Sequence, residues 1–222
     1  MKILDAGDDA LLVVPSLAQR GDVAADAEAA DAEAGVADPG ASDAATDVVL
    51  GLWRALIAAA PSWLVAAQPA YLSLHVVFDG SVDAGVVRGF LSTLRPRARV
   101  GEVRVVDVPV VYDGADLEFV ADHCGLCVDE VVERHTAARY RVAFMGFVPG
   151  FAYLLGLDDK LRGVPRLPTP RARVPVGAVG LTGDQTGVYP SSTPGGWRLI
   201  GRALRGLGDA APDDVVQFHR AP

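Results

Sequence analysis

Cysteine, long apolar runs and signal-like segments are scarce or missing in this 222-residue sequence. Two cysteines are too few for the disulfide framework of a small secreted protein. The longest apolar stretch, Leu56 to Ala67, is interrupted by Pro61 and is too short to span a bilayer. Asp5 and Asp8 lie where a secretory signal needs basic and apolar residues. We therefore expect a cytoplasmic protein without a membrane segment.

The motifs of common nucleotide-binding and hydrolytic sites are also missing. There is no G-x-x-x-x-G-K-[ST] loop, no strand-linked G-x-G-x-x-G, no H-E-x-x-H and no G-x-S-x-G. The acidic pair Asp158-Asp159 fits a solvated turn as well as a cation site. The sequence by itself therefore identifies no nucleophile and no metal site.

Charge is unevenly distributed along the chain, whose net charge is −8. Residues 20–47 contain eight acidic residues and one basic residue, whereas residues 134–205 contain eleven Lys or Arg against three Asp. Ten of those eleven are Arg, which favours planar, bidentate contacts with carboxylate or phosphate. A solvated basic face is the alternative explanation.

Short strands and amphipathic helices predict a small α/β domain over residues 1–108. Residues 21–43 lack aromatic residues, Leu and Ile, so we expect a disordered acidic insertion there. Pro109 favours an edge strand or a crossover between domains. The expected strands are 2–4, 10–14, 71–78 and 103–111, and the expected helices are 46–60 and 82–94, the second capped by Ser81.

Residues 109–222 predict a second domain. A helical pair at 116–123 and 128–135 is separated by Gly125, which is placed to end the first helix. After Tyr140, short apolar segments alternate with Gly and Pro turns, as in an antiparallel barrel or sandwich. The fold class is therefore α+β.

Glycine, proline, aromatic residues and arginine are dense between Tyr140 and Arg202. Gly permits positive φ and close approach, and Pro fixes φ, so this density predicts loops held in particular shapes. Such loops often carry function. From the residues alone we infer a rigid, Arg-lined site for an anion.

Two further groups allow more than one interpretation. Cys124 and Cys127 form a C-x-x-C pair, which fits a metal or redox site less well than two semi-buried apolar residues, Cys127 being placed as a helix N-cap. His135 ends the second helix and fits either an acid/base group or a cap on helix carbonyls.

The dense stretch closely resembles the family of the B subunit of 5-oxoprolinase, also called allophanate hydrolase subunit 1 and KipI-like kinase A inhibitor. The resemblance is strong over residues 102–202 and weaker at the opening strands and Pro69–Leu74. The chain departs from the family at the acidic insertion, at Ala203-Leu204 and in a shortened tail at 212–218. The matching runs are Asp116–Ala121, His135, Tyr140–Val142, Gly146–Leu154, Pro165–Arg166, Thr169–Arg171, Val174–Gly177, Gln185–Pro190 and Pro194–Arg202.

The resemblance implies a small α/β N-terminal domain followed by a cyclophilin-like antiparallel β-barrel. It implies an obligate partner, the KipA-like C subunit, and a third, lactam-opening A subunit, with no nucleic-acid or membrane partner. The implied activity is ATP-dependent opening of 5-oxo-L-proline to L-glutamate, with ATP and Mg held by the complex. Two alternatives are a component of an allophanate hydrolase or urea carboxylase-type carboxyltransferase, and a regulatory inhibitor of a sensor histidine kinase.

Phosphorylating a lactam oxygen requires positive charge and hydrogen-bond donors rather than a nucleophilic side chain. On this basis Arg166, Arg171 and Arg202 are candidate clamps for an anion. The resemblance adds His135, since the family keeps a His at this offset, and the candidate catalytic residues are His135, Arg166 and Arg171. The candidate residues for binding substrate or nucleotide are Gly146, Phe147, Pro149, Gly150, Phe151, Tyr153, Gln185, Tyr189, Pro194, Gly195, Gly196, Trp197 and Arg202.

Overall fold

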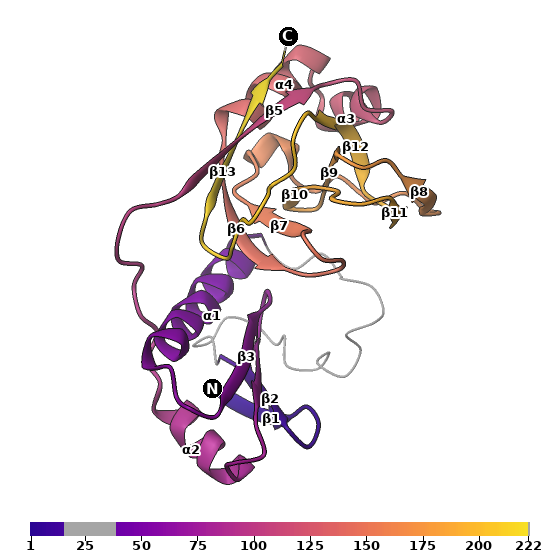
Figure 1. Cartoon of the computed structure of the whole chain (residues 1–222). Coiled ribbons are helices and arrows are strands. Elements are labelled where there is room, and N and C mark those ends of the chain that lie inside the picture. Colours follow the sequence, from indigo (N-terminus) through magenta and orange to yellow (C-terminus); the bar gives the residue numbers. More distant parts are fainter. Residues whose placement is uncertain (16–38, 222) are drawn as a thin grey trace. The chain divides into compact units, whose positions relative to one another are not determined.

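The computed structural model describes residues 1–15 and 39–221, with side chains from residue 44 in the second stretch. The chain divides into two compact units, Met1–Val100 and Gly101–Pro222 (Figure 1). The division falls eight residues before the expected position at residue 108, because strand β5 (Val105–Val111) pairs with strands of the second unit. The α+β fold class, with a small sheet-and-helix unit followed by a barrel, is confirmed.

The first unit is a four-stranded antiparallel sheet in the order β1-β2-β4-β3 with two helices. Its buried cluster joins alternate residues of β2 and β4 to one face of each helix, as in Leu11, Val76, Leu56 and Leu91. The elements are β1 (Lys2–Asp5), β2 (Ala10–Val14), α1 (Pro39–Ala59), β3 (Leu64–Pro69), β4 (Leu74–Phe78) and α2 (Ala84–Thr93).

Helix α1 begins seven residues earlier than the expected start at Thr46. Pro39 stands at its first position, where a missing N–H costs nothing and the fixed φ suits a helix. The last five residues of the disordered insertion expected at 21–43 are therefore helical instead, at residues 39–43. Residues 21–38 lie outside the described residues. None of the helices in the described ranges is long and apolar enough to cross a membrane.

Strand β3 was not predicted from the sequence. It lies in an Ala-rich segment whose burial does not alternate regularly, so the usual strand signal is weak. Strand β4 begins at Leu74 rather than Tyr71. Helix α2 is capped by Asp83, whose carboxylate accepts from Gly85 N at 2.7 Å, rather than by the expected Ser81.

The second unit is a closed barrel in the order β10-β7-β6-β13-β5-β12-β9. A two-stranded hairpin of β8 and β11, two helices and a short 3₁₀ turn complete it. The elements not yet given are α3 (Leu117–Cys124), α4 (Val128–Ala137), β6 (Arg139–Met145), β7 (Ala152–Leu155), η1 (Asp159–Leu161), β8 (Arg171–Val174), β9 (Ala178–Thr182), β10 (Gln185–Val188), β11 (Thr193–Gly195), β12 (Arg198–Ala203) and β13 (Val215–Arg220).

One pair of strands in the barrel is parallel, so the expected purely antiparallel barrel needs correction. Strand β13 pairs in parallel with β5, from Val215 opposite Val105 to Arg220 opposite Val110 (Figure 1). Pro109 lies within β5, between β12 and β13, so it is not at a sheet edge, which was one of the two positions we expected. The first and last strands of the unit thus close the barrel together.

The helix boundaries around the C-x-x-C pair follow the sequence prediction. Gly125 ends α3 in the left-handed region at φ 65°. Cys127 caps α4, and the Glu130 carboxylate accepts from the Cys127 backbone N–H at 2.7 Å. The two cysteines are free thiols, and burial raises the pKa of Cys124.

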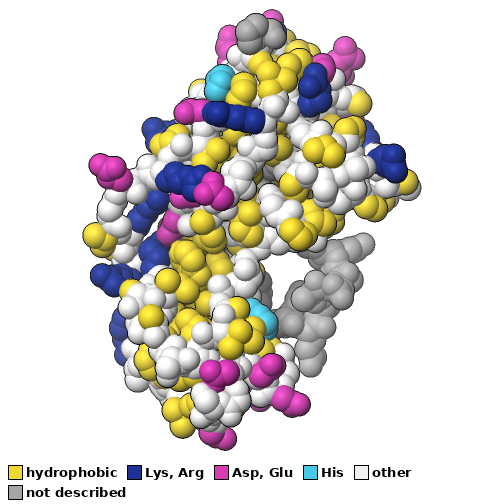
Figure 2. All heavy atoms as spheres, viewed as in Figure 1, with side chains coloured by type: hydrophobic (Ala, Val, Ile, Leu, Met, Phe, Trp, Pro, Cys, Tyr) yellow, Lys and Arg dark blue, Asp and Glu magenta, His cyan; other side chains and the backbone are white. Residues whose placement is uncertain are grey.

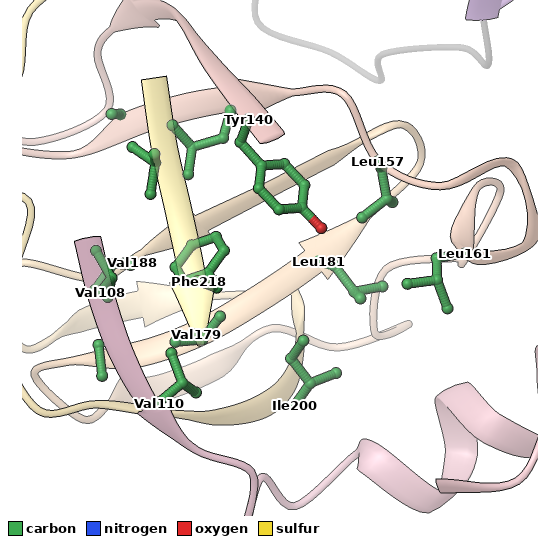
Figure 3. Close-up of a cluster of buried hydrophobic side chains, with 14 of the residues drawn as sticks. Val108, Val110, Tyr140, Leu157, Leu161, Val179, Leu181, Val188, Ile200 and Phe218 are labelled. Carbon is green, nitrogen blue, oxygen red and sulfur yellow. The ribbon is translucent and has the colours of Figure 1, made fainter. Parts of the chain in front are cut away.

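His135 lies in the barrel core beside Tyr140 and Phe218, two of the largest buried side chains of the cluster in Figure 3. Thr186 Oγ1 donates to the carbonyl of Gly180 at 2.9 Å, so it accepts from His135 Nε2–H at 3.1 Å. Nδ1 then accepts from the Tyr112 hydroxyl at 2.8 Å. The ring does not cap helix carbonyls as one of our interpretations held.

Burial lowers the pKa of His135 to about 3. The unfolded chain binds a proton on this ring near pH 6.5, so below that pH the unfolded state binds more protons than the folded state. As the pH falls from 6.5 to 3, we expect His135 to lower the free energy of unfolding by about 1.4 kcal/mol per pH unit. Urea unfolding of wild type and His135→Gln across this range measures it.

The matched control is His219→Gln, which changes an exposed histidine of β13. We expect His135→Gln to flatten the pH profile and His219→Gln to leave it as in wild type. Equal slopes for wild type and His135→Gln would contradict the assignment of a buried, neutral imidazole.

Candidate functional site

A small pocket between the barrel and the β8–β11 hairpin brings together eight of the predicted site residues. Its volume is about 110 Å³. Ligand pockets for drug-sized molecules measure about 300–1,000 Å³, so this one suits a small molecule. Its lining residues are Phe147, Phe151, Tyr153, Arg166, Tyr189, Gly195, Gly196 and Trp197.

The aromatic walls of the pocket pack edge to face. The ring of Phe151 lies 5.3 Å from Tyr189 and 5.4 Å from Trp197, at interplanar angles of 67° and 79°. Phe151 and Trp197 are 1% and 6% exposed, so both are anchored in a second small core below the pocket. Burial raises the pKa of the Tyr189 and Tyr153 hydroxyls, which keeps both neutral. The walls are therefore formed before any ligand arrives.

Gly195 allows the hairpin to approach the wall closely. A Cβ atom added there would lie 2.6 Å from the Tyr189 hydroxyl and 3.0 Å from Val174. A Cβ added to Gly196 would have its nearest neighbour, Pro170, at 3.7 Å, an ordinary contact. Adjacent glycines thus have different roles: Gly195 is required by packing, and Gly196 keeps one side of the pocket open.

The loop between β6 and β7 holds Phe147 in a strained conformation. Its φ is 67°, and Val148 N donates to the Gly146 carbonyl at 2.8 Å, which closes a tight γ-turn around it. A left-handed conformation costs a non-glycine residue roughly 1–2 kcal/mol. The ring is 56% exposed and lines both the pocket and a neighbouring open hollow. Strain at a ligand-facing residue is typical of functional loops.

Arg166 supplies positive charge to the pocket. It is exposed, and no hydrogen bond or ion pair joins its side chain to another residue of the described ranges. Its backbone is held on both sides, because Arg198 Nε donates to the Pro165 carbonyl at 3.1 Å and Leu167 N donates to the Gly196 carbonyl at 2.7 Å. The backbone around Arg166 is thus held in place, whereas its guanidinium group is available to a ligand.

Arg171 has a different environment from Arg166. Its Nη2 lies 2.8 Å from Asp116 Oδ2, and its Nη1 donates to the Trp197 carbonyl at 3.3 Å. Arg171 was predicted to hold the ligand, and in the structure its guanidinium is engaged by the protein's own groups. Asp116 was not among the predicted site residues.

The remaining predicted residues lie outside the pocket. His135 is in the barrel core, and Gln185 lies at the opposite end of β10 from the pocket residue Tyr189. Arg202 is half exposed, with Asp113 Oδ2 at 4.0 Å. Pro194 is exposed in β11. Gly146, Pro149 and Gly150 line the neighbouring hollow formed by the Phe147 loop.

Charged side chains do not form a continuous field on the face drawn in Figure 2, where Lys and Arg of the barrel unit lie scattered among apolar groups. In the part of the chain that the structure describes, no group of three or more His, Cys, Asp or Glu is placed to hold a metal ion. The local chemistry of the pocket is therefore one exposed guanidinium beside apolar walls and backbone groups.

Residues 1–216 match the protein family described as "Carboxyltransferase domain, subdomain C and D". The chain belongs to this family. Three similar curated proteins are each named as the B subunit of 5-oxoprolinase. The one from Escherichia coli O157:H7 is 51% identical over 52% of this chain and 54% of its own length. Those from Bacillus subtilis (strain 168) and Haemophilus influenzae are 40% and 43% identical, over 60% and 62% of this chain.

The match spans 62% and 66% of the lengths of the latter two relatives. Among solved structures, TTHA0988 (space group P212121) is 38% identical with a TM-score of 0.71, over 85% of this chain and 38% of that chain. The K. lactis urea amidolyase has a TM-score of 0.70 over 99% of this chain and 15% of its own, but at 16% identity it shows the fold alone. The match therefore spans about half to two thirds of the length of the curated relatives, and smaller shares of these two solved structures.

The packing around Gly195 gives a test of the pocket's construction. Gly195→Ala forces a methyl group against the Tyr189 hydroxyl, and overpacking of this kind costs about 1–3 kcal/mol. Gly196→Ala has room for its methyl group and is expected to stay within about 0.5 kcal/mol of wild type. Urea unfolding of both variants measures the difference, and equal stabilities would show that the hairpin does not pack as described.

Proposed function

We propose that this chain is the B subunit of an ATP-dependent 5-oxoprolinase, which opens 5-oxo-L-proline to L-glutamate. The observation that carries the proposal is the pocket: a guanidinium without a protein partner in the described ranges faces pre-formed aromatic walls. The similarity to three proteins that are named as this component of 5-oxoprolinase supports this activity over the alternatives.

The substrate matches the pocket in size and chemistry. 5-Oxoproline is a flat five-membered lactam with one carboxylate. Arg166 offers a planar fork that suits a carboxylate, and the aromatic rings offer apolar contact for the lactam ring. In this proposal, backbone groups at Gly195 and Gly196, which also line the pocket, hydrogen-bond to the lactam amide.

By itself the pocket, at about 110 Å³, lies below the usual range for a ligand as large as a nucleotide, whereas the open hollow beside it measures about 320 Å³. In this proposal, ATP and its Mg are held by other parts of the complex. The role of this chain is then to bind and orient the lactam. The KipA-like C subunit and the lactam-opening A subunit supply the rest of the reaction.

Arg166 variants test the proposal in the co-purified complex. Losing a charge-assisted contact costs roughly 1.5–3 kcal/mol, so Arg166→Gln should raise KM for 5-oxoproline about ten- to a hundredfold. Arg166→Lys keeps the charge but loses the fork and should lie between Gln and wild type. The measurement is ATP-dependent glutamate release per folded complex, with and without this chain.

The control is Arg173→Gln, an exposed arginine of β8 outside the pocket, which should keep wild-type KM. An unchanged KM in Arg166→Gln would refute the carboxylate contact. A complex that hydrolyses 5-oxoproline equally well without this chain would refute the function, and inhibition of a sensor histidine kinase would favour the regulatory alternative.

Phe147 gives a test of the partner proposal. A strained aromatic ring that is 56% exposed beside the pocket suits contact with a partner protein. Phe147→Ser should weaken binding of the KipA-like partner by about 2 kcal/mol, or roughly thirtyfold, as at interface hot spots. Titration calorimetry measures it, and Val176→Ser, which changes another exposed apolar residue, should bind as wild type does.

A further inference from the structure

Asp116 is a buried carboxylate that joins three separate segments next to the pocket. It is 6% exposed and stands just before α3. Its Oδ2 accepts from the Leu199 backbone N–H at 2.7 Å and from Arg171 Nη2 at 2.8 Å. Its Oδ1 lies 3.6 Å from Arg198 Nη1. The start of α3, the start of β8 and the start of β12 are therefore tied to one side chain.

We propose that Asp116 is a positioning residue that fixes the pocket through Arg171 and Arg198. The proposal rests on the proposed function for its link to substrate. Asp116 binds no ligand itself, because its carboxylate is buried and its oxygens are engaged by the protein.

Arg198 transmits this constraint to the segment that carries Arg166. Its side chain is 11% exposed, and its guanidinium carbon lies 3.6 Å from the centre of the Phe119 ring. With Asp116 on one side and Phe119 on its face, Arg198 directs its Nε to the Pro165 carbonyl at 3.1 Å. Pro165 immediately precedes Arg166. The Asp116 carboxylate therefore controls, through Arg198, the position of the Arg166 backbone from which the free guanidinium extends.

Arg171 transmits the same constraint to the opposite wall. Its Nη2 binds Asp116, and its Nη1 donates to the carbonyl of Trp197, whose ring lines the pocket. The next peptide but one, at Leu199, donates directly to Asp116. Asp116 thus holds both the Trp197 wall and the Arg166 loop in place, which keeps the distance between them constant.

Asp116 also determines which arginines carry free charge. Two guanidinium groups face one carboxylate, so Arg171 and Arg198 are partly neutralised and held away from the ligand. Removing the carboxylate charge leaves both guanidinium groups unpaired beside the pocket.

The first experiment measures position and needs no activity. Amide hydrogen exchange is compared in wild type, Asp116→Asn and the matched control Asp113→Asn, which changes an exposed carboxylate three residues away. We expect exchange at Leu167 N–H and Leu199 N–H to rise about tenfold or more in Asp116→Asn alone, with barrel-core amides of β9 unchanged. Unchanged exchange at Leu167 would overturn the proposal. Equal acceleration throughout the barrel would also overturn it, by showing a general stability role.

The second experiment is a double-mutant cycle for 5-oxoproline hydrolysis by the co-purified complex. Asp116→Asn in wild type should raise KM about tenfold with a smaller change in kcat, and the effect should nearly vanish when Arg166 is already Gln. Asp116→Glu should raise KM less than Asp116→Asn does, because it keeps the carboxylate charge. Additive effects of the two substitutions would overturn the proposal. If wild-type complex shows no turnover, the proposed function fails, and hydrogen exchange still decides the role of Asp116.

Discussion

The parallel pairing of β5 with β13 is the constraint on which the barrel unit depends. It joins residues about a hundred positions apart, so its loop-closure entropy must be offset by the core that it seals. Val108 and Val216, on these two strands, are fully buried in that core. Strand β12 pairs with β5 on the other side, and β12 begins at the pocket. Weaker pairing between β5 and β13 would therefore disturb the pocket as well as the barrel.

The pocket is built as a second layer outside this barrel. Phe151, Tyr189 and Trp197 belong to a small cluster separate from the main core, with Val174 from the hairpin. Because the cluster is buried and closely packed, the walls resist rearrangement. The strained γ-turn at Phe147 stands at its margin, where the packing ends. A rigid wall beside a strained, exposed loop suits a site that meets both a small ligand and another protein surface.

Local signals in the sequence predicted local features well, because Gly125 and Cys127 mark helix ends through their own backbone and capping preferences. Strand β3 was missed, since its Ala-rich sequence lacks the alternation that identifies a strand. Asp116 was missed because its partners Arg171 and Leu199 lie 55 and 83 residues further along the chain, and no local pattern encodes such contacts. Sequence therefore predicted Arg166 and Arg171 near the site, but it also selected Arg202, which lies outside the pocket, and it missed Arg198. It could not distinguish the engaged arginines from the free one.

That distinction governs the electrostatics of the site more than net charge does. The chain carries a net charge of −8, but screening limits the reach of exposed charges to about 8–10 Å in physiological salt. Close to the pocket, Arg171 and Arg198 outnumber the one buried carboxylate between them, and Arg166 adds a further positive charge. The local balance is cationic. In the proposed function, this acidic chain holds a small carboxylate because pairing at Asp116 fixes two of the cations and leaves the third, Arg166, for the ligand.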